Sequence, residues 1–176
     1  MRLPIAFLLI ALAFPALAEE KIWHVKAFHP DGKLLDVKAV DKQGKIYPIK
    51  AVQTDDNLHV LDIKALYDDK RLPVKVLIGA DKFEPVKAIA DDGTILDVKA
   101  ITADGQKLDI KGVRRSGSII HIKAIGDGGA FYGVKAISPE GRVYDIKGIK
   151  MLPAKQEGTI NGVAFAAHIK ALPQAP

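Results

Sequence analysis

The repeating unit of the chain is clearest in Ile95-Leu96-Asp97-Val98-Lys99-Ala100-Ile101, Thr102-Ala103-Asp104-Gly105-Gln106 and Lys107-Leu108-Asp109-Ile110-Lys111. Apolar and charged side chains alternate in the first and last of these segments, and β-branched residues are frequent, which is typical of β-strands. The Asp-Gly step in the middle segment favours a tight turn, because glycine readily adopts a positive φ. The stretch therefore predicts a β-hairpin.

The same unit recurs along the chain. Its marker is a lysine within Val/Ile-Lys-Ala or a close variant, and most successive markers are 12 residues apart. The repeat lysines are Lys26, Lys38, Lys50, Lys64, Lys75, Lys87, Lys99, Lys111, Lys123, Lys135, Lys147 and Lys170. The last interval is longer and contains the loop Lys155-Gln156-Glu157-Gly158. Short strands with turn signals at this spacing predict an all-β array.

The pairing register of the hairpin follows from the length of its loop. A three-residue loop over 103–105, with glycine last, is a type I turn followed by a left-handed residue. This loop places Lys99 opposite Asp109 and, further along, Asp97 opposite Lys111. The same register in the preceding hairpin places Lys87 opposite Asp97. Each facing pair of opposite charges stabilises the sheet by about 0.2–1 kcal/mol.

Because successive side chains of a strand point to opposite sides, the sheet has two unlike faces. Leu96, Val98, Ala100 and their equivalents form an apolar face, which we expect to be the core. Aspartates and lysines occupy the other face. We predict an antiparallel up-and-down meander of about twelve short strands, closed as a flattened barrel or folded as a sandwich, with its first and last strands meeting. A parallel solenoid is the less favoured alternative, because it would stack lysine on lysine.

The N-terminus has the pattern of a secretory signal peptide. Arg2 supplies a positive charge, residues 5–14 are apolar, and Ala16-Leu17-Ala18 is a small-x-small cleavage site. The apolar run is shorter than the roughly 20 residues that span a membrane. We therefore predict a signal peptide over 1–18, a single β-repeat domain over 19–176, and a location in the periplasm or outside the cell. The chain has no cysteine, so no disulfide can stabilise the domain.

Catalytic and metal-binding signatures are not found in the sequence. It has no phosphate-binding loop, no nucleophile elbow and no zinc-protease motif, so we expect neither an enzyme nor a cofactor. His24, His121 and His168 stand two residues before a repeat lysine, where aspartate is common. A metal site would need His24 and His168 to meet where the sheet closes. The neighbouring lysines would repel a cation there, so we predict no metal.

The repeat lysines are the main candidates for binding. Four repeat lysines have neither aspartate nor histidine two residues before them in the same strand: Lys50, Lys75, Lys87 and Lys135. These four are the predicted anion-binding residues, and the alternative is a solvated face that keeps the array soluble. The formal net charge of +5 suits anionic partners. Nucleic acid is not expected, because aromatic residues make up only 6% and do not alternate with the lysines.

These features predict an exported, non-enzymatic binding or scaffolding protein. Its expected partner is an anionic polysaccharide or lipid surface, or else a protein. One alternative is a small outer-membrane barrel, in which the Leu/Val/Ala face would meet lipid and the charged face would line a wet lumen. Another is a round barrel that carries an apolar ligand in its interior.

Overall fold

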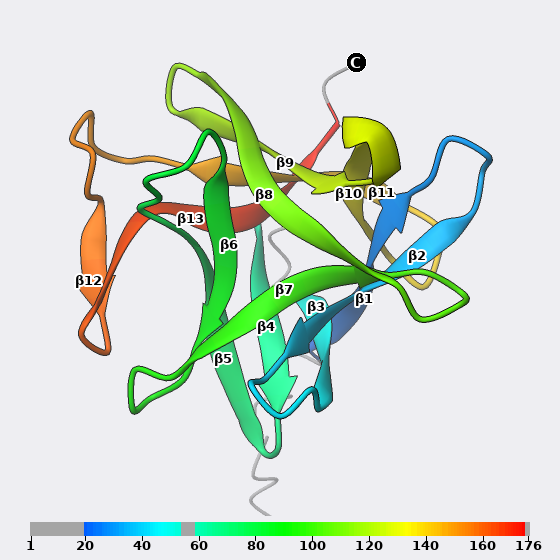
Figure 1. The fold of residues 1–176 in the computed structure, drawn as a ribbon, viewed down its shortest axis with the longest axis horizontal. Helices are drawn as coiled ribbons and strands as arrows, with labels where there is room; N and C mark the ends of the chain where they lie inside the picture. The colour runs from blue at the N-terminus through cyan, green and yellow to red at the C-terminus, as the bar shows by residue number, and fades with distance from the viewer. Residues whose placement is uncertain (1–19, 54–58, 175–176) are drawn as a thin grey trace, which may run out of the picture.

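The computed structural model describes residues 20–53 and 59–174, and their regular structure is almost entirely β-strand (Figure 1). The strands are β1 Lys21–Phe28, β2 Leu34–Val40, β3 Ile46–Gln53, β4 Leu61–Tyr67, β5 Lys70–Leu77, β6 Glu84–Ile89, β7 Ile95–Ile101, β8 Lys107–Ser116, β9 Ile119–Ile125, β10 Phe131–Ile137, β11 Val143–Ile149, β12 Gly158–Ile160 and β13 Val163–Pro173. A short 3-10 helix, η1, covers Asp127–Gly129. The predicted signal peptide, residues 1–18, lies outside the described residues.

The turns between consecutive strands follow the predicted geometry. At 102–106 the amide of Gly105 donates to the carbonyl of Thr102 at 3.0 Å, and Thr102 donates to the carbonyl of Gln106 at 3.0 Å. Gly105 has a φ of 87°, the left-handed value that the turn requires. The predicted register beside the turn is confirmed, because Lys99 lies opposite Asp109 and Lys87 opposite Asp97.

Hairpin pairing covers only part of each strand. The prediction that the β7–β8 ladder continues until Asp97 faces Lys111 is wrong. Lys111 lies instead opposite Pro85, on β6. Strands twist and diverge, and here the two ends of a strand pair with different neighbours. In β2, for example, one end pairs with β1 and the other with β3, while β7 runs along the opposite edge.

Twelve of the described strands form four triangles in which three strands pair with one another. The first triangle is β1–β2–β3, the second is β4–β5–β13, the third is β6–β7–β8 and the fourth is β9–β10–β11. Six further antiparallel pairings connect the triangles: β1–β10, β2–β7, β3–β4, β5–β6, β8–β9 and β11–β13. Each triangle is thereby joined once to each of the other three, which is the connectivity of a tetrahedron.

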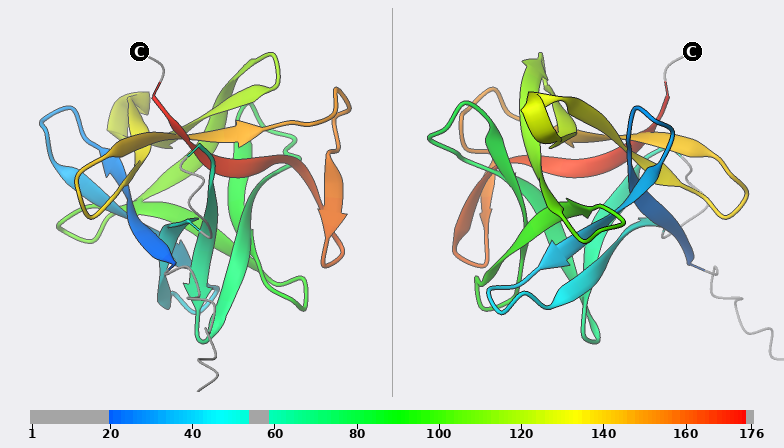
Figure 2. Two further views of the ribbon diagram at one scale, coloured as in Figure 1. Left: turned by 180° about the vertical axis from the view of Figure 1, so that it is seen from behind. Right: turned by 45° about the vertical axis from the view of Figure 1, so that its right-hand side comes forward.

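The predicted all-β, antiparallel and closed architecture is confirmed. It is a closed twelve-stranded barrel with one additional strand, and its strands run in several directions around the centre (Figures 1 and 2). The expectation that the first and last strands meet is wrong, because β1 pairs with β10 and β13 pairs with β11, β5 and β4. The extra strand, β12, pairs only with β13 among the described strands and stands at the side of the shell.

The core occupies the centre of the shell. The residue before each repeat lysine is a buried valine or isoleucine, and these residues surround a central void of about 10 Å³. They are Val25, Val37, Ile49, Ile63, Val74, Val86, Val98, Ile110, Ile122, Val134, Ile146 and Ile169. A void of this size is scarcely enough for one water molecule. The interior is therefore filled by side chains, and the Leu/Val/Ala face points inward as the sequence predicts.

Small residues follow eleven of the twelve repeat lysines, because the strands approach closely there. Ala27, Ala39 and Ala100 are fully buried at this position. At Gly112 an added Cβ would lie 2.7 Å from Ile120, and at Gly148 it would lie 3.1 Å from the same side chain. The alternation of β-branched and small residues thus sets how closely the strands pack. No helix in the described part of the chain is long and apolar enough to cross a membrane.

Candidate functional site: the lysine triads

Each triangle gathers three repeat lysines on the outer side of the shell. The first triad is Lys26, Lys38 and Lys50; the second is Lys64, Lys75 and Lys170; the third is Lys87, Lys99 and Lys111; the fourth is Lys123, Lys135 and Lys147. The core residue on each side of a lysine points inward, so period two directs the lysine outward. The repeat therefore produces four clusters of cations.

Within a triad, each lysine faces the position two residues before the lysine of a neighbouring strand. That position holds an aspartate for five of the twelve lysines, and all five form ion pairs. These pairs are Lys26–Asp36, Lys87–Asp97, Lys99–Asp109, Lys135–Asp145 and Lys170–Asp62. The aspartates act within the triads as cross-strand partners, as the sheet register requires.

An aspartate also contacts the repeat lysine that follows it in its own strand. The Nζ of Lys38 lies 3.4 Å from Asp36, and the Nζ of Lys147 lies 3.2 Å from Asp145. Burial raises the pKa of Asp145, but hydrogen bonds from lysines such as Lys135 outweigh it and lower the pKa to about 2. One carboxylate therefore compensates two ammonium groups.

Four repeat lysines make no ion pair with a carboxylate in the described part of the chain: Lys50, Lys75, Lys111 and Lys123. Lys50 and Lys75 lie against histidines instead, with Nζ to Nδ1 distances of 3.0 Å to His24 and 2.7 Å to His168. Lys111 faces Pro85, and Lys123 faces Gly133.

Burial, with repulsion from neighbouring lysines, lowers the pKa of Lys50 and Lys123 and lowers that of Lys75 to about 8. Desolvation disfavours the charged form of an amine, and nearby cations add to this effect. A bound anion would oppose both effects, because it favours the charged form of the amine. The positive charge at these lysines is therefore incompletely compensated by the protein itself.

The four triads differ in their balance of charge. The third contains three lysines and two aspartates, Asp97 and Asp109, whereas each of the others contains three lysines and one aspartate. With neutral histidines the third triad carries a formal charge of +1 and the others +2 each. Figure 2 shows the closed shell on which the triangles lie; because each triad sits on the outside of a different triangle, the triads face different directions.

The four lysines predicted from the sequence fall into four different triads. Lys75 and Lys87 are cross-strand neighbours on β5 and β6, while Lys50 and Lys135 lie elsewhere. Lys50 and Lys75 make no ion pair with a described carboxylate, in line with the criterion that selected them. Lys87 and Lys135 do have one, on the next strand, because partners are set across strands and not along them. The same reason explains why the sequence criterion missed Lys111 and Lys123.

The two histidines considered for a metal site are not brought together. His24 belongs to the first triangle and His168 to the second, each beside a lysine. Repulsion from Lys50, followed by burial, lowers the pKa of His24; burial and then Lys75 lower that of His168. Among the described residues, no group of three or more His, Cys, Asp and Glu side chains is placed to hold a metal ion.

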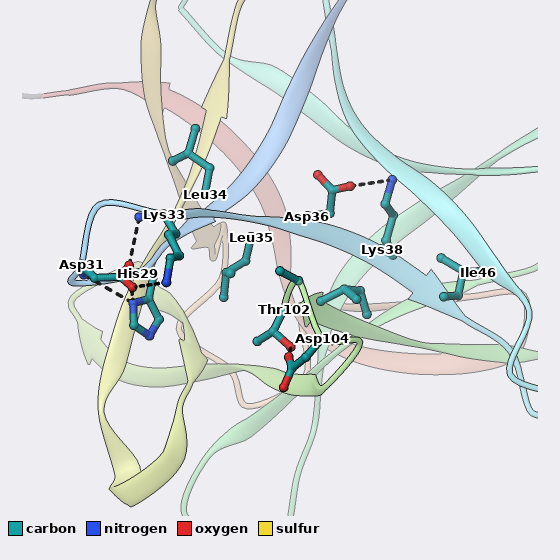
Figure 3. A pocket seen from close by; sticks show the side chains of 12 residues that line it. His29, Asp31, Lys33, Leu34, Leu35, Asp36, Lys38, Ile46, Thr102 and Asp104 are labelled. Carbon is teal, nitrogen blue, oxygen red and sulfur yellow. Dashed lines mark hydrogen bonds and ion pairs between the residues drawn. The ribbon is translucent and has the colours of Figure 1, made fainter.

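A groove of about 760 Å³ lies between the β1–β2 turn and the β7–β8 turn (Figure 3). His29 and Lys33 both contact Asp31, at 2.6 Å and 2.9 Å, and a hydrogen bond from Lys33 is the main cause that lowers the pKa of that carboxyl. Asp104, on the opposite side, accepts a hydrogen bond from Thr102. The charges of this groove are matched internally, which makes it a weaker anion site than the triads.

The comparison with family models gives a clear assignment. The chain belongs to a family of unknown function, DUF7486, whose model matches residues 19–172. The match therefore includes all twelve repeat lysines. No curated protein and no solved structure matches the chain.

Proposed function

We propose that this protein is exported and binds polyanions, without catalysis, through its lysine triads. The observation that carries the proposal is a shortage of carboxylates within residues 20–53 and 59–174: five aspartates serve twelve repeat lysines there, and Lys50, Lys75, Lys111 and Lys123 form no ion pair with any of them. Export is supported by the N-terminal signal pattern and by a family match that starts at residue 19, where we expect the mature chain to begin. A periplasmic or extracellular location follows from it.

The arrangement of the triads favours an anionic polysaccharide over a flat lipid surface. A plane can approach a closed shell from one side only and leaves the remaining triads unused. A flexible anionic chain can reach several triads in turn, and linked weak contacts raise the overall affinity. A rigid shell with several cationic clusters can also hold two such chains together. The proposed role is therefore that of a non-enzymatic polysaccharide binder or scaffold.

Two other functions receive less support. An outer-membrane barrel would need the Leu/Val/Ala face to meet lipid, but this face forms the core. A carrier would need room for an apolar ligand, and the central void is about 10 Å³. Chemistry at the Asp–Lys pairs is also disfavoured, because the same pair recurs in all four triads whereas an active site is usually singular.

The test compares two quadruple variants with the same change in charge. Lys50, Lys75, Lys111 and Lys123 are replaced with glutamine in one, and Lys33, Lys42, Lys107 and Lys155, which lie outside the triads, in the other. Polygalacturonate and vesicles containing phosphatidylglycerol are the probes, titrated at several salt concentrations. We expect the first variant to lose at least tenfold in affinity for polygalacturonate, and the second far less.

Binding by the parent should also weaken steeply as salt rises, because exposed charges are screened over about 8–10 Å. Equal losses in the two variants would mean that total charge, and not the triads, determines binding. Tighter binding to the vesicles than to polygalacturonate would favour a lipid surface instead. Absence of binding between the parent and either probe at low salt would contradict the proposed function.

A further inference from the structure

A pocket of about 500 Å³ opens beside the fourth triad. Its lining residues come from the β8–β9 hairpin, the start of β10 and the segment that precedes β6. Its walls combine cations from Lys82, Arg114 and Lys123 with aromatic rings from Phe83 and Phe131. No aspartate or glutamate is among the residues that line it, in contrast to the groove of Figure 3.

An irregularity in β8 places the arginine of this pocket. Gly112 lies opposite Ile122, and the register then shifts so that Arg114 lies opposite His121. Val113 is the additional residue of this bulge and also lines the pocket. Bulges redirect side chains and are frequent beside functional sites. β8 has ten residues, so it extends beyond the seven residues that β7 and β9 each have.

The cations around the pocket lack carboxylate partners. Lys111 and Lys123 face each other across β8 and β9, and neither makes an ion pair within the described residues. The same holds for Lys82 and Arg114. Lys123 faces Gly133, which has no side chain. Lysines at the equivalent position in other strands, such as Lys99, face an aspartate. Positive charge is thus concentrated at the junction of the third and fourth triads.

The acidic groups nearest to this junction are few. Glu84 lies opposite Gly112 and is not among the residues that line the pocket. Asp145 is already bound by Lys135 and Lys147. Because neither carboxylate lines the pocket, an incoming anion would meet cations there and no resident competitor.

The aromatic side of the pocket is exposed to solvent. Phe131 is 49% exposed, and its ring packs edge-on against Phe83 with centroids 5.6 Å apart. Lys82 lies over the Phe83 ring at 5.2 Å. A ligand with an apolar ring face would cover Phe131 and remove apolar surface from water, which is favourable. Cations on one side and a bare ring on the other define an amphipathic anion site.

We propose that this pocket binds an anionic group carried on a ring, as in an acidic or phosphorylated sugar unit. The anionic group lies between Arg114 and Lys123, and the apolar face of the ring covers Phe131. The inference rests on the proposed function, since Lys123 belongs to the fourth triad. It adds a preference for the group that bears the charge, which lysine clusters alone do not supply.

The experiment measures binding of three small probes by calorimetry at low salt: inorganic phosphate, glucose 6-phosphate and phenyl phosphate. We expect the parent to bind at least one ring-bearing phosphate about tenfold more tightly than inorganic phosphate. A preference for glucose 6-phosphate identifies a sugar ligand, and a preference for phenyl phosphate identifies an aromatic one. Either preference supports the pocket.

Variants separate the two sides of the site. Phe131→Ala should abolish the preference for the ring while leaving phosphate binding intact, and Phe131→Leu should reduce it without loss of apolar bulk. Arg114→Gln should weaken the binding of all three probes. The matched controls are Arg115→Gln, the next residue of the hairpin, and Leu152→Ala, a side chain 52% exposed elsewhere. Both controls should bind like the parent.

Two results would overturn the inference: equal affinity of the parent for all three probes, or a ring preference that survives Phe131→Ala. A parent that binds polygalacturonate but shows no ring preference overturns the pocket and leaves the proposed function standing. A parent that shows the ring preference but no polysaccharide binding supports the pocket and contradicts the proposed function.

Discussion

The second and third triads share one backbone pattern but differ in how their lysines are neutralised. In the third triad, consecutive strands bring two aspartates between three lysines. In the second, β13 returns from the end of the chain and supplies His168, so among the described residues Asp62 is the one aspartate that pairs with its lysines. The apolar repeat therefore determines which face of each strand is buried, whereas the residue two places before each lysine determines the local charge.

Removal of a carboxylate should affect the two triads unequally. Asp62→Asn removes the carboxylate that pairs with Lys170 and Lys64 in the described part of the second triad, and because this side chain is 42% exposed we expect the free energy of unfolding to fall by about 1.5 kcal/mol. Asp109→Asn leaves Asp97 in the third triad, so a loss of about 1 kcal/mol is expected. Urea unfolding measures both, with the exposed Asp81→Asn as control. Equal losses would mean that the number of carboxylates per triad is unimportant.

The same lysine substitution should have opposite signs in the two triads. Lys75→Met removes a charge that is disfavoured by burial, so it should raise the free energy of unfolding at pH 7 by about 1 kcal/mol. Lys99→Met removes a lysine bound to Asp109 and should lower it by about 1 kcal/mol. Thermal or urea unfolding of the two variants and the parent measures both changes. A loss of stability in both variants would show that Lys75 is compensated after all.

The two triads should also differ in how the free energy of unfolding depends on pH. The pKa of Lys75 is about 8 in the folded protein, below the ordinary value of 10.5. Between these values the unfolded chain holds a proton that the folded protein has released, so stability contributed by this group rises with pH across the window and is constant below it. The gain between pH 8 and 10.5 should be smaller in Lys75→Met than in the parent, whereas Lys99→Met should retain it.

The smallest expected effect is the coupling within one ion pair of the third triad. Lys99 and Asp109 have side chains that are 22% and 47% exposed, so water weakens their attraction. A double-mutant cycle should give a coupling of about 0.2–1 kcal/mol. A value of several kcal/mol would show that the charged surface of the triads behaves as a desolvated interior.

Local features of the fold could be predicted from the sequence because they depend on neighbouring residues. The Asp104-Gly105 turn and the pairing of Lys99 with Asp109 follow from loop length and period two. The pairing of β2 with β7 or of β1 with β10 could not be predicted. All repeats carry the same apolar pattern, so no residue distinguishes one distant partner from another.

The candidate site could be predicted only in part, because the partner of each lysine lies on another strand. Lys50 and Lys75 were identified from their own strands, but Lys87 and Lys135 have partners on the next strand. Replacing those two would leave Asp97 and Asp145 without their closest cations, so the four residues chosen from the sequence would combine a binding test with a loss of stability. Lys111 and Lys123 could be identified only once the β6–β8 and β9–β10 pairings were known, because these place them opposite Pro85 and Gly133.

The return of β13 to the second triangle also determines when the chain can finish folding. Lys170 and Asp62 are separated by 108 positions. Contacts so distant in sequence carry a large entropy of loop closure and slow the folding reaction. The first, third and fourth triangles use consecutive strands, but β4 and β5 keep an open side until the C-terminal strand is present. The exported chain that we propose would thus complete the second triangle only after β13 had become available to pair with β4 and β5.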